Sequence, residues 1–196
     1  MDKAKEVARF VSGRIASIEK SGNERYRTAI LAQLRRGVGR GPGEIPQLWG
    51  ILLQALPEEM MGRGKEPSYE EWAVYTALTL YAFHQQGMDP TQESMNVEGR
   101  GIGSAAAKLI DEEEDLIRLQ NRFNRFALAE DRPQIETQLR GLVSMLRSHK
   151  IGLDYPLLAS QLYRYQFHDN MSGIRLAWGR DFYRTYDHDF KEDTEK

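Results

Sequence analysis

The sequence predicts an all-α protein, a compact bundle of about eight or nine helices, and three observations support this. Apolar residues recur at intervals of three and four along almost the whole chain, which is the period of one helix face. Prolines and capping side chains stand at the starts of these apolar segments. No run of alternating apolar residues is convincing enough to predict a strand.

The predicted helices follow one another along the chain with short connections. They cover residues 3–20, 23–36, 46–56, 70–86, 102–110, 112–129, 133–149, a segment that begins after Asp154, and 172–186. Their boundaries carry residues that favour helix starts or ends, namely Gly37, Pro46, Ser68 with Glu71, Pro133, and Asp154 with Pro156. The helix over 70–86 is apolar on nearly every side, which predicts a place at the centre of the fold.

Residues 1–186 are expected to form one helical domain, which could divide into packed sub-bundles of roughly 1–86 and 102–186. The segment 87–101 between them is the longest irregular stretch, so it is the best candidate for a boundary or a mobile loop. Residues 187–196 are charged and are expected to be a disordered tail.

Composition excludes several classes of protein. The net charge is −2, which argues against a free-standing, non-specific DNA-binding protein but leaves room for a local basic surface. The 27 basic residues comprise 19 arginines and 8 lysines. Arginine suits phosphate because its planar donors can pair with two oxygens at once.

The same composition bears on location. The chain has no cysteine, which excludes disulfides, thiol chemistry and cysteine zinc sites, and fits a reducing cytoplasm. Charged residues at positions 2, 3, 5 and 6 interrupt any apolar signal peptide. The longest apolar stretch, Trp72 to Phe83, is too short to span a bilayer. A cytoplasmic protein without membrane contact is therefore expected.

Three arginines mark a candidate binding surface. Arg118, Arg122 and Arg125 have the spacing i, i+4, i+7, which places them on one stripe of a helix. Each precedes an apolar residue, so the stripe runs beside the buried face rather than opposite it. Arg118 can pair with Glu114 or Asp115. Arg122 and Arg125 have no acid at contact spacing in their own helix. Such a row can bind a polyanion, or it can be a solvated face paired with acids elsewhere.

Signatures of catalysis are weak. The glycine-rich segment 99–103 precedes a helix but follows no strand, which disfavours a nucleotide loop. The acids at 111–115 point around a helix instead of converging on a metal, and the helix dipole alone favours them there. An HD-type phosphohydrolase would need His84 or His149, the pair His168-Asp169, and Asp181 or Asp187. Asp169 is also a plausible helix cap, so neither enzymatic activity nor any metal or cofactor is expected.

The chain resembles the CasB family, the small subunit of the type I-E CRISPR surveillance complex called Cascade. The resemblance rests on the order and spacing of Trp49 and of the segments 32–37 (AQLRRG), 75–86 (YTALTLYAFHQQ), 101–103 (GIG), 121–126 (NRFNRF), 139–143 (LRGLV), 153–158 (LDYPLL) and 178–183 (WGRDFY). It covers residues 1–186. It implies a non-catalytic helical subunit present in two copies between the large subunit and the backbone subunits. Its basic surface would hold the guide RNA–target DNA heteroduplex and the displaced strand.

The resemblance also implies which side chains bind nucleic acid. The family's arginines map onto Arg35, Arg36, Arg122 and Arg140, while Arg125 and Arg147 are added because no acid lies near them in the sequence. The full candidate set also includes Arg118 and Lys108. Some family members carry a basic residue in the small helix where this chain has alanines 105–107, with Lys108 nearby.

Simpler interpretations of these residues stay open. The dipole favours Arg35 and Arg36 at a helix end, and Arg140 can pair with Glu136. The competing function is a structural subunit whose arginines bind acidic protein surfaces. His84, Trp49, Trp72 and Trp178 are expected in the core, since their neighbours are apolar.

Overall fold

The computed structural model describes residues 2–54 and 56–194, with side chains described as far as residue 189. The helices are α1 (Lys3–Glu19), α2 (Glu24–Arg35), η1 (Pro46–Leu48), α3 (Trp49–Leu52), η2 (Glu58–Met60), α4 (Tyr69–His84), α5 (Ile102–Ala107), α6 (Asp115–Ala127), α7 (Arg132–Ser148), α8 (Tyr155–Tyr165) and α9 (His168–Thr194). Among the described residues the only strand-like pairing is one bridge between Asn96 and Leu153. The predicted all-α fold is therefore confirmed.

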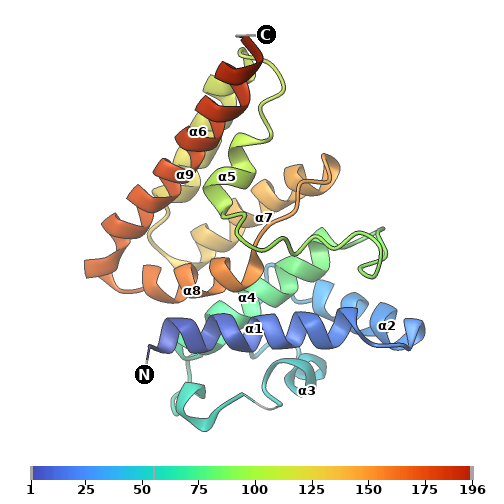
Figure 1. The fold of residues 1–196 in the computed structure, drawn as a ribbon. Helices are drawn as coiled ribbons and strands as arrows, with labels where there is room; N and C mark the ends of the chain where they lie inside the picture. Colours follow the sequence, from blue (N-terminus) through green and yellow to red (C-terminus); the bar gives the residue numbers. More distant parts are fainter. Residues whose placement is uncertain (1, 55, 195–196) are drawn as a thin grey trace.

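Helix α4 forms the centre of the molecule, as its apolar composition predicted. Nearly all of its residues are buried, and it packs against α1, α2, α7 and α8 (Figure 1). Its start is fixed by the predicted capping box. The Ser68 Oγ accepts from the Glu71 N–H at 2.9 Å, and the Glu71 carboxylate accepts from the Ser68 N–H at 2.7 Å.

The second half of the chain forms a layer that rests on the first. Helix α8 lies along α1 and α4, while α6 and α9 run side by side away from it (Figure 1). The aromatic side chains of α6 pack on those of α9: Phe123 stacks on Phe182 with ring centroids 5.1 Å apart, and Phe126 lies 4.6 Å from Trp178. One continuous cluster of buried side chains extends through both halves.

The irregular segment 87–101 connects the two halves tightly. Its Met95 N–H donates to the Gln85 Oε1 at 2.8 Å, and its Gly99 N–H donates to the Asp154 Oδ2 at 2.7 Å. The Asn96 Oδ1 accepts from the Tyr155 N–H at 3.1 Å. These bonds attach the segment to both α4 and α8, so it joins the halves instead of leaving a free loop between them.

Two predicted helices have different boundaries in the structure. The segment 46–56 is helical only to Leu52, because Gly50 weakens a helix and Pro57 prevents its continuation. Helix α9 begins at His168, only two residues after the end of α8. Asp169 therefore lies within the first turn, and the prediction that it caps a helix starting at 172 was wrong.

Helix α9 also extends beyond its predicted end. The expected disordered tail from residue 187 is helical as far as Thr194, and residues 195–196 lie outside the described part. Helix α5 supports this extension: the Lys108 Nζ lies 2.9 Å from the Asp189 Oδ2. Local sequence patterns cannot predict an ion pair between residues so far apart in the chain.

Candidate nucleic-acid interface

Three of the predicted arginines lie together along helix α7. A shallow hollow is lined by Arg122 of α6, by Arg140 and Arg147 of α7, and by Phe83, Thr137, Gly141, Ser144, Met145 and Ser148. We name this hollow the arginine groove. Arg140 and Arg147 are seven residues apart on one helix, so their Cα atoms are separated by about 10 Å along its axis.

Arg122 reaches the groove from the neighbouring helix. Because Phe123 and Phe126 face α9, the adjacent stripe of α6 turns towards α7. The Arg122 Cζ lies 3.4 Å from the position that a Cβ on Gly141 would occupy. The arginine stripe of α6 lies beside the buried face, as predicted, and this position brings the Arg122 guanidinium to α7 as the third in the groove.

Arg140 is exposed and does not pair with Glu136. The Glu136 carboxylate instead accepts a hydrogen bond of 2.6 Å from the Trp72 indole, and burial raises its pKa. The Arg140 Nη1 lies 3.8 Å from the Cβ position of Gly39. This places Arg140 beside the glycine-rich loop that follows α2.

Arg147 is held in place by neutral groups. Its Nη1 donates to the Gln86 Oε1 at 2.9 Å, and its Cζ lies 4.5 Å from the centroid of the Phe83 ring. Both contacts orient the guanidinium, and neither neutralises its charge. The half-buried side chain is therefore already ordered, which lowers the entropy lost when an anion binds.

The glycine-rich loop contributes a second basic group. Arg36 and Arg40 line a hollow with Gln33, Glu44, Ile45, Gln47 and Leu48. The sequence analysis does not predict Arg40 as a binding residue, because it lies in a loop outside the predicted helices. The available signal was a lone cation between glycines shortly after Arg35 and Arg36. The position of Arg140 beside Gly39 links this group to the arginine groove.

The remaining predicted residues differ in their surroundings. Arg118 pairs with Asp115 at 2.5 Å, and Lys108 pairs with Asp189 at 2.9 Å. Arg35 is half-buried, and burial lowers its pKa. Arg125 is exposed on α6, one turn beyond Arg122.

The grouped arginines form no direct ion pair among the described residues, although Glu44 lines the same hollow as Arg36 and Arg40. Within the described part of the chain, no carboxylate lies within 4.0 Å of the guanidinium groups of Arg36, Arg40, Arg122, Arg125, Arg140 and Arg147. A set of like charges without local partners is stabilised when a polyanion approaches. The surface is thus chemically suited to phosphate.

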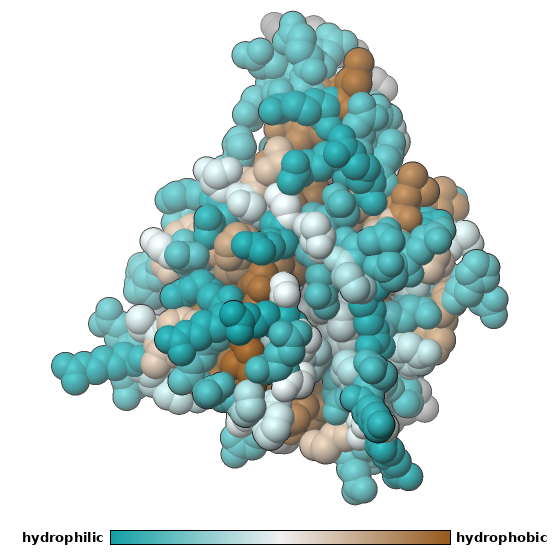
Figure 2. All heavy atoms as spheres, turned by 180° about the vertical axis from the view of Figure 1, so that it is seen from behind, coloured by the Kyte–Doolittle hydropathy of each residue, from teal (hydrophilic) through white to brown (hydrophobic). Residues whose placement is uncertain are grey.

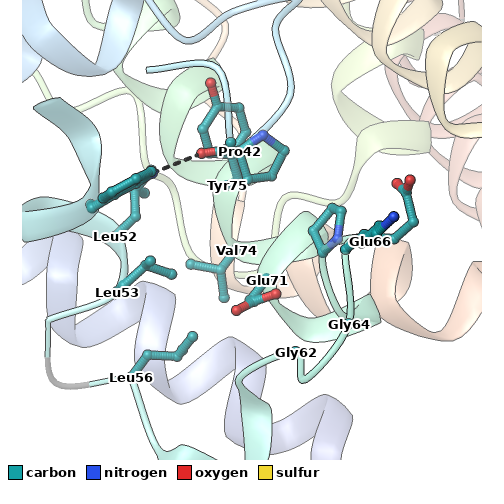
Figure 3. A pocket seen from close by; sticks show the side chains of 14 residues that line it. Pro42, Leu52, Leu53, Leu56, Gly62, Gly64, Glu66, Glu71, Val74 and Tyr75 are labelled. Atoms are coloured by element: carbon teal, nitrogen blue, oxygen red, sulfur yellow. Dashed lines mark hydrogen bonds between the residues drawn. The ribbon is translucent and has the colours of Figure 1, made fainter. Parts of the chain in front are cut away.

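A separate apolar hollow lies between α3 and α4. Leucines 52, 53 and 56 face Val74 and Tyr75 across a cavity of about 220 Å³ (Figure 3). Trp49 lines this hollow and is 47% exposed, so its predicted place in the core was wrong. Its indole N–H donates to the Pro42 carbonyl at 3.3 Å, the bond dashed in Figure 3. Trp72 and Trp178 are buried, as predicted.

The residues that an HD-type site would need form no metal-binding group in the described part of the chain. His84 is fully buried, and its Nδ1 lies 2.9 Å from the Tyr155 hydroxyl. Burial lowers the pKa of His84 to about 4. In the described residues, no three histidine, aspartate or glutamate side chains come together in a way that could hold a metal ion.

One face of the molecule is largely polar. Seen from behind, it is mostly hydrophilic, with separate small apolar patches (Figure 2). Within the described residues, no helix combines the length and the apolar character needed to cross a membrane.

Comparison with known proteins identifies the family. The family model described as CRISPR-associated protein Cse2 matches residues 30–183. None of the curated proteins matches the sequence.

Solved structures agree with the family model. The CasB structure from Thermobifida fusca is 34% identical, covers 90% of this chain and 97% of its own, and superposes with a TM-score of 0.73. CasB from Thermus thermophilus shares 21% identity, covers 94% and 99%, and has a TM-score of 0.64, which supports the fold alone. The chain therefore belongs to the Cse2 family, also named CasB, of CRISPR-associated Cascade subunits.

Proposed function

We propose that this protein is the non-catalytic small subunit of a type I-E Cascade complex. In this proposal it stabilises the guide RNA–target DNA heteroduplex and the displaced strand. The observation that carries the proposal is the arginine groove, in which Arg122, Arg140 and Arg147 converge without an acidic partner within 4.0 Å among the described residues.

The chemistry required of such a subunit is modest. Base pairing between guide and target reads the sequence, while the protein adds backbone contacts that favour a nearly balanced strand exchange. Arginine is suited to this role because its guanidinium can donate two parallel hydrogen bonds to a phosphate. Three guanidinium groups distributed over about 10 Å of helix can contact more than one phosphate.

The other basic residues have graded roles in this proposal. Arg36 and Arg40 extend the basic surface along the loop after α2, and Arg125 extends it along α6. Arg118 and Lys108 contribute less, because each already pairs with an acid. Arg35 acts mainly in packing, since it is half-buried. The large subunit, the backbone subunits and a second copy of this chain are the proposed protein partners.

The test is the affinity of assembled Cascade for target DNA at several salt concentrations. Replacing Arg122 and Arg140 by alanine should weaken binding about tenfold, because charged hydrogen bonds to phosphate are lost. The slope of log affinity against log salt should fall by about 1 for each lost contact. The preferred target sequence should stay the same, because phosphate contacts carry no sequence information.

Arg118→Ala is the matched control on the same helix. Its guanidinium is engaged by Asp115, so its loss should change affinity and salt slope little. An unchanged salt slope in the double variant, or an altered sequence preference, would contradict nucleic-acid contact by the groove.

A purely structural subunit is the second candidate function. It is favoured by the half-exposed Trp49 beside an apolar hollow, a type of surface that proteins often contact. If the arginines bind acidic surfaces of other subunits, Arg122→Ala and Arg140→Ala will reduce incorporation of this subunit, as measured by native mass spectrometry. Complexes that still assemble will then bind DNA normally. A metal-dependent nuclease assay tests the absence of enzymatic activity.

A further inference from the structure

Gly141 occupies an unusual place in the arginine groove. It lies in the middle of α7, a helix of 17 residues that forms one wall of the groove. Glycine weakens a helix interior relative to alanine, because its backbone loses more conformational freedom on folding. Its presence at this point therefore needs a physical reason.

The space above Gly141 is filled by a single side chain. The three nearest heavy atoms to an added Cβ all belong to Arg122, with Nη2 the closest, Cζ at 3.4 Å and Nε at 3.8 Å. The guanidinium thus reaches over the α7 backbone at the point where any other residue would place its Cβ. Alanine at this position would displace the flexible end of Arg122 and would not collide with backbone.

Other helix glycines provide the comparison. Gly13 of α1 and Gly179 of α9 have open space around their Cβ positions. Gly103 of α5 faces the backbone of α9, so it serves helix packing. Among the glycines within the described helices, Gly141 is the one whose Cβ position lies against the charged end of a side chain from another helix.

We infer that Gly141 is a positioning residue that provides the place for the Arg122 guanidinium on α7. The glycine lets an arginine of α6 join Arg140 and Arg147 of α7 in one cluster. The expected effect of Gly141 on nucleic-acid binding rests on the proposed function. The placement of Arg122 itself depends only on the geometry of the two helices.

The test compares Gly141→Ala with Gly13→Ala, Arg122→Ala and the double variant Gly141→Ala/Arg122→Ala. Both glycine variants should raise the melting temperature of the protein by about 2 °C, because each removes a helix-interior glycine. Of the two glycine variants, only Gly141→Ala should weaken target-DNA binding by assembled Cascade, by about two- to threefold, with a reduced salt slope. The double variant should bind no more weakly than Arg122→Ala alone, because both changes act through one side chain.

An NMR measurement separates the inference from the proposed function. The Arg122 Nε–H signal, assigned by its loss in Arg122→Lys, should shift in Gly141→Ala and not in Gly13→Ala. Weaker binding by Arg122→Ala but not by Gly141→Ala would overturn the inference and leave the proposed function intact. Normal binding by Arg122→Ala would instead count against the proposed role of Arg122. In that case the Arg122 Nε–H signal decides the inference. A shifted signal in Gly141→Ala would uphold it, and an unshifted signal would overturn it.

Discussion

At the residue scale, the environment decides what each arginine can do. Arg118 and Arg122 are one helical turn apart and chemically identical. The first pairs with Asp115, while the second reaches over Gly141 without an acid within 4.0 Å among the described residues. A free guanidinium can offer its full charge to phosphate, whereas a paired one must first give up its partner. The two residues therefore make a matched pair for mutagenesis.

His84 gives a prediction for the pH dependence of stability. Its burial between α4 and α8 lowers its pKa from 6.5 to about 4, and the nearby Arg147 charge acts in the same direction. The unfolded chain binds a proton at about pH 6.5 and the folded protein does not. The contribution to stability is therefore present above pH 6.5 and is lost as the pH falls towards 4. The loss is at most about 3 kcal/mol.

The measurement is urea unfolding of the wild type and of His84→Gln between pH 7.5 and 4.5. Glutamine keeps an acceptor for the Tyr155 hydroxyl but does not titrate. The wild type should lose stability relative to the variant as the pH is lowered. Parallel curves for the two proteins would show that His84 is free to take up a proton in the folded state.

At the element scale, α5 and α9 pack closely at Gly103. A Cβ on Gly103 would stand 3.0 Å from the Phe182 backbone nitrogen and closer still to the Trp178 carbonyl oxygen. The small residues of α5 allow this approach, and the Thr185 hydroxyl donates to Ser104 at 3.0 Å across the same contact. This close packing helps to keep α9 helical beyond the end that its own sequence predicts.

Gly103→Ala should therefore destabilise the protein by about 1–3 kcal/mol, because a methyl group there must push two helix backbones apart. Gly179→Ala is the control on α9, since nothing lies within 4 Å of its Cβ position. Its stability should be equal to or slightly greater than that of the wild type. Chemical denaturation measures both, and a Gly103 variant as stable as the Gly179 variant would contradict the close contact.

At the scale of the whole molecule, the two halves of the chain share one core. Helix α8 of the second half packs along α1 and α4 of the first, and segment 87–101 is bonded to both α4 and α8. The single-domain organisation stays a prediction from the sequence. The continuous buried cluster gives it a physical basis, because neither half can unfold without exposing the apolar surface of the other.

We expect one cooperative unfolding transition. Trp49 and Trp72 lie in the first half and Trp178 in the second, so Trp49→Phe/Trp72→Phe leaves tryptophan fluorescence from the second half alone and Trp178→Phe leaves it from the first. In each variant the fluorescence midpoint in urea should coincide with the midpoint from circular dichroism at 222 nm. Displaced midpoints or a plateau would show that the sub-bundles unfold separately.

Several features of the fold could be predicted because their causes are local. The capping box at Ser68 and the cap at Asp154 depend on residues within one helical turn, and both form as expected. The central position of α4 follows from its apolar surface on all sides. Features that depend on distant residues were missed: the exposure of Trp49, the extension of α9 and the place of Arg40 beside the groove.

By itself, the sequence determined the all-α class, the order of the helices, the family resemblance and the stripe of arginines on α6. Helical periodicity and capping act over a few residues, so they can be recognised in a single chain. Only the tertiary structure decided which cations meet. Arg122 joins Arg140 and Arg147 because α6 packs beside α7 at a glycine, whereas Lys108 is paired because α9 continues past it. These outcomes depend on distances between residues far apart in the chain, which no local pattern encodes.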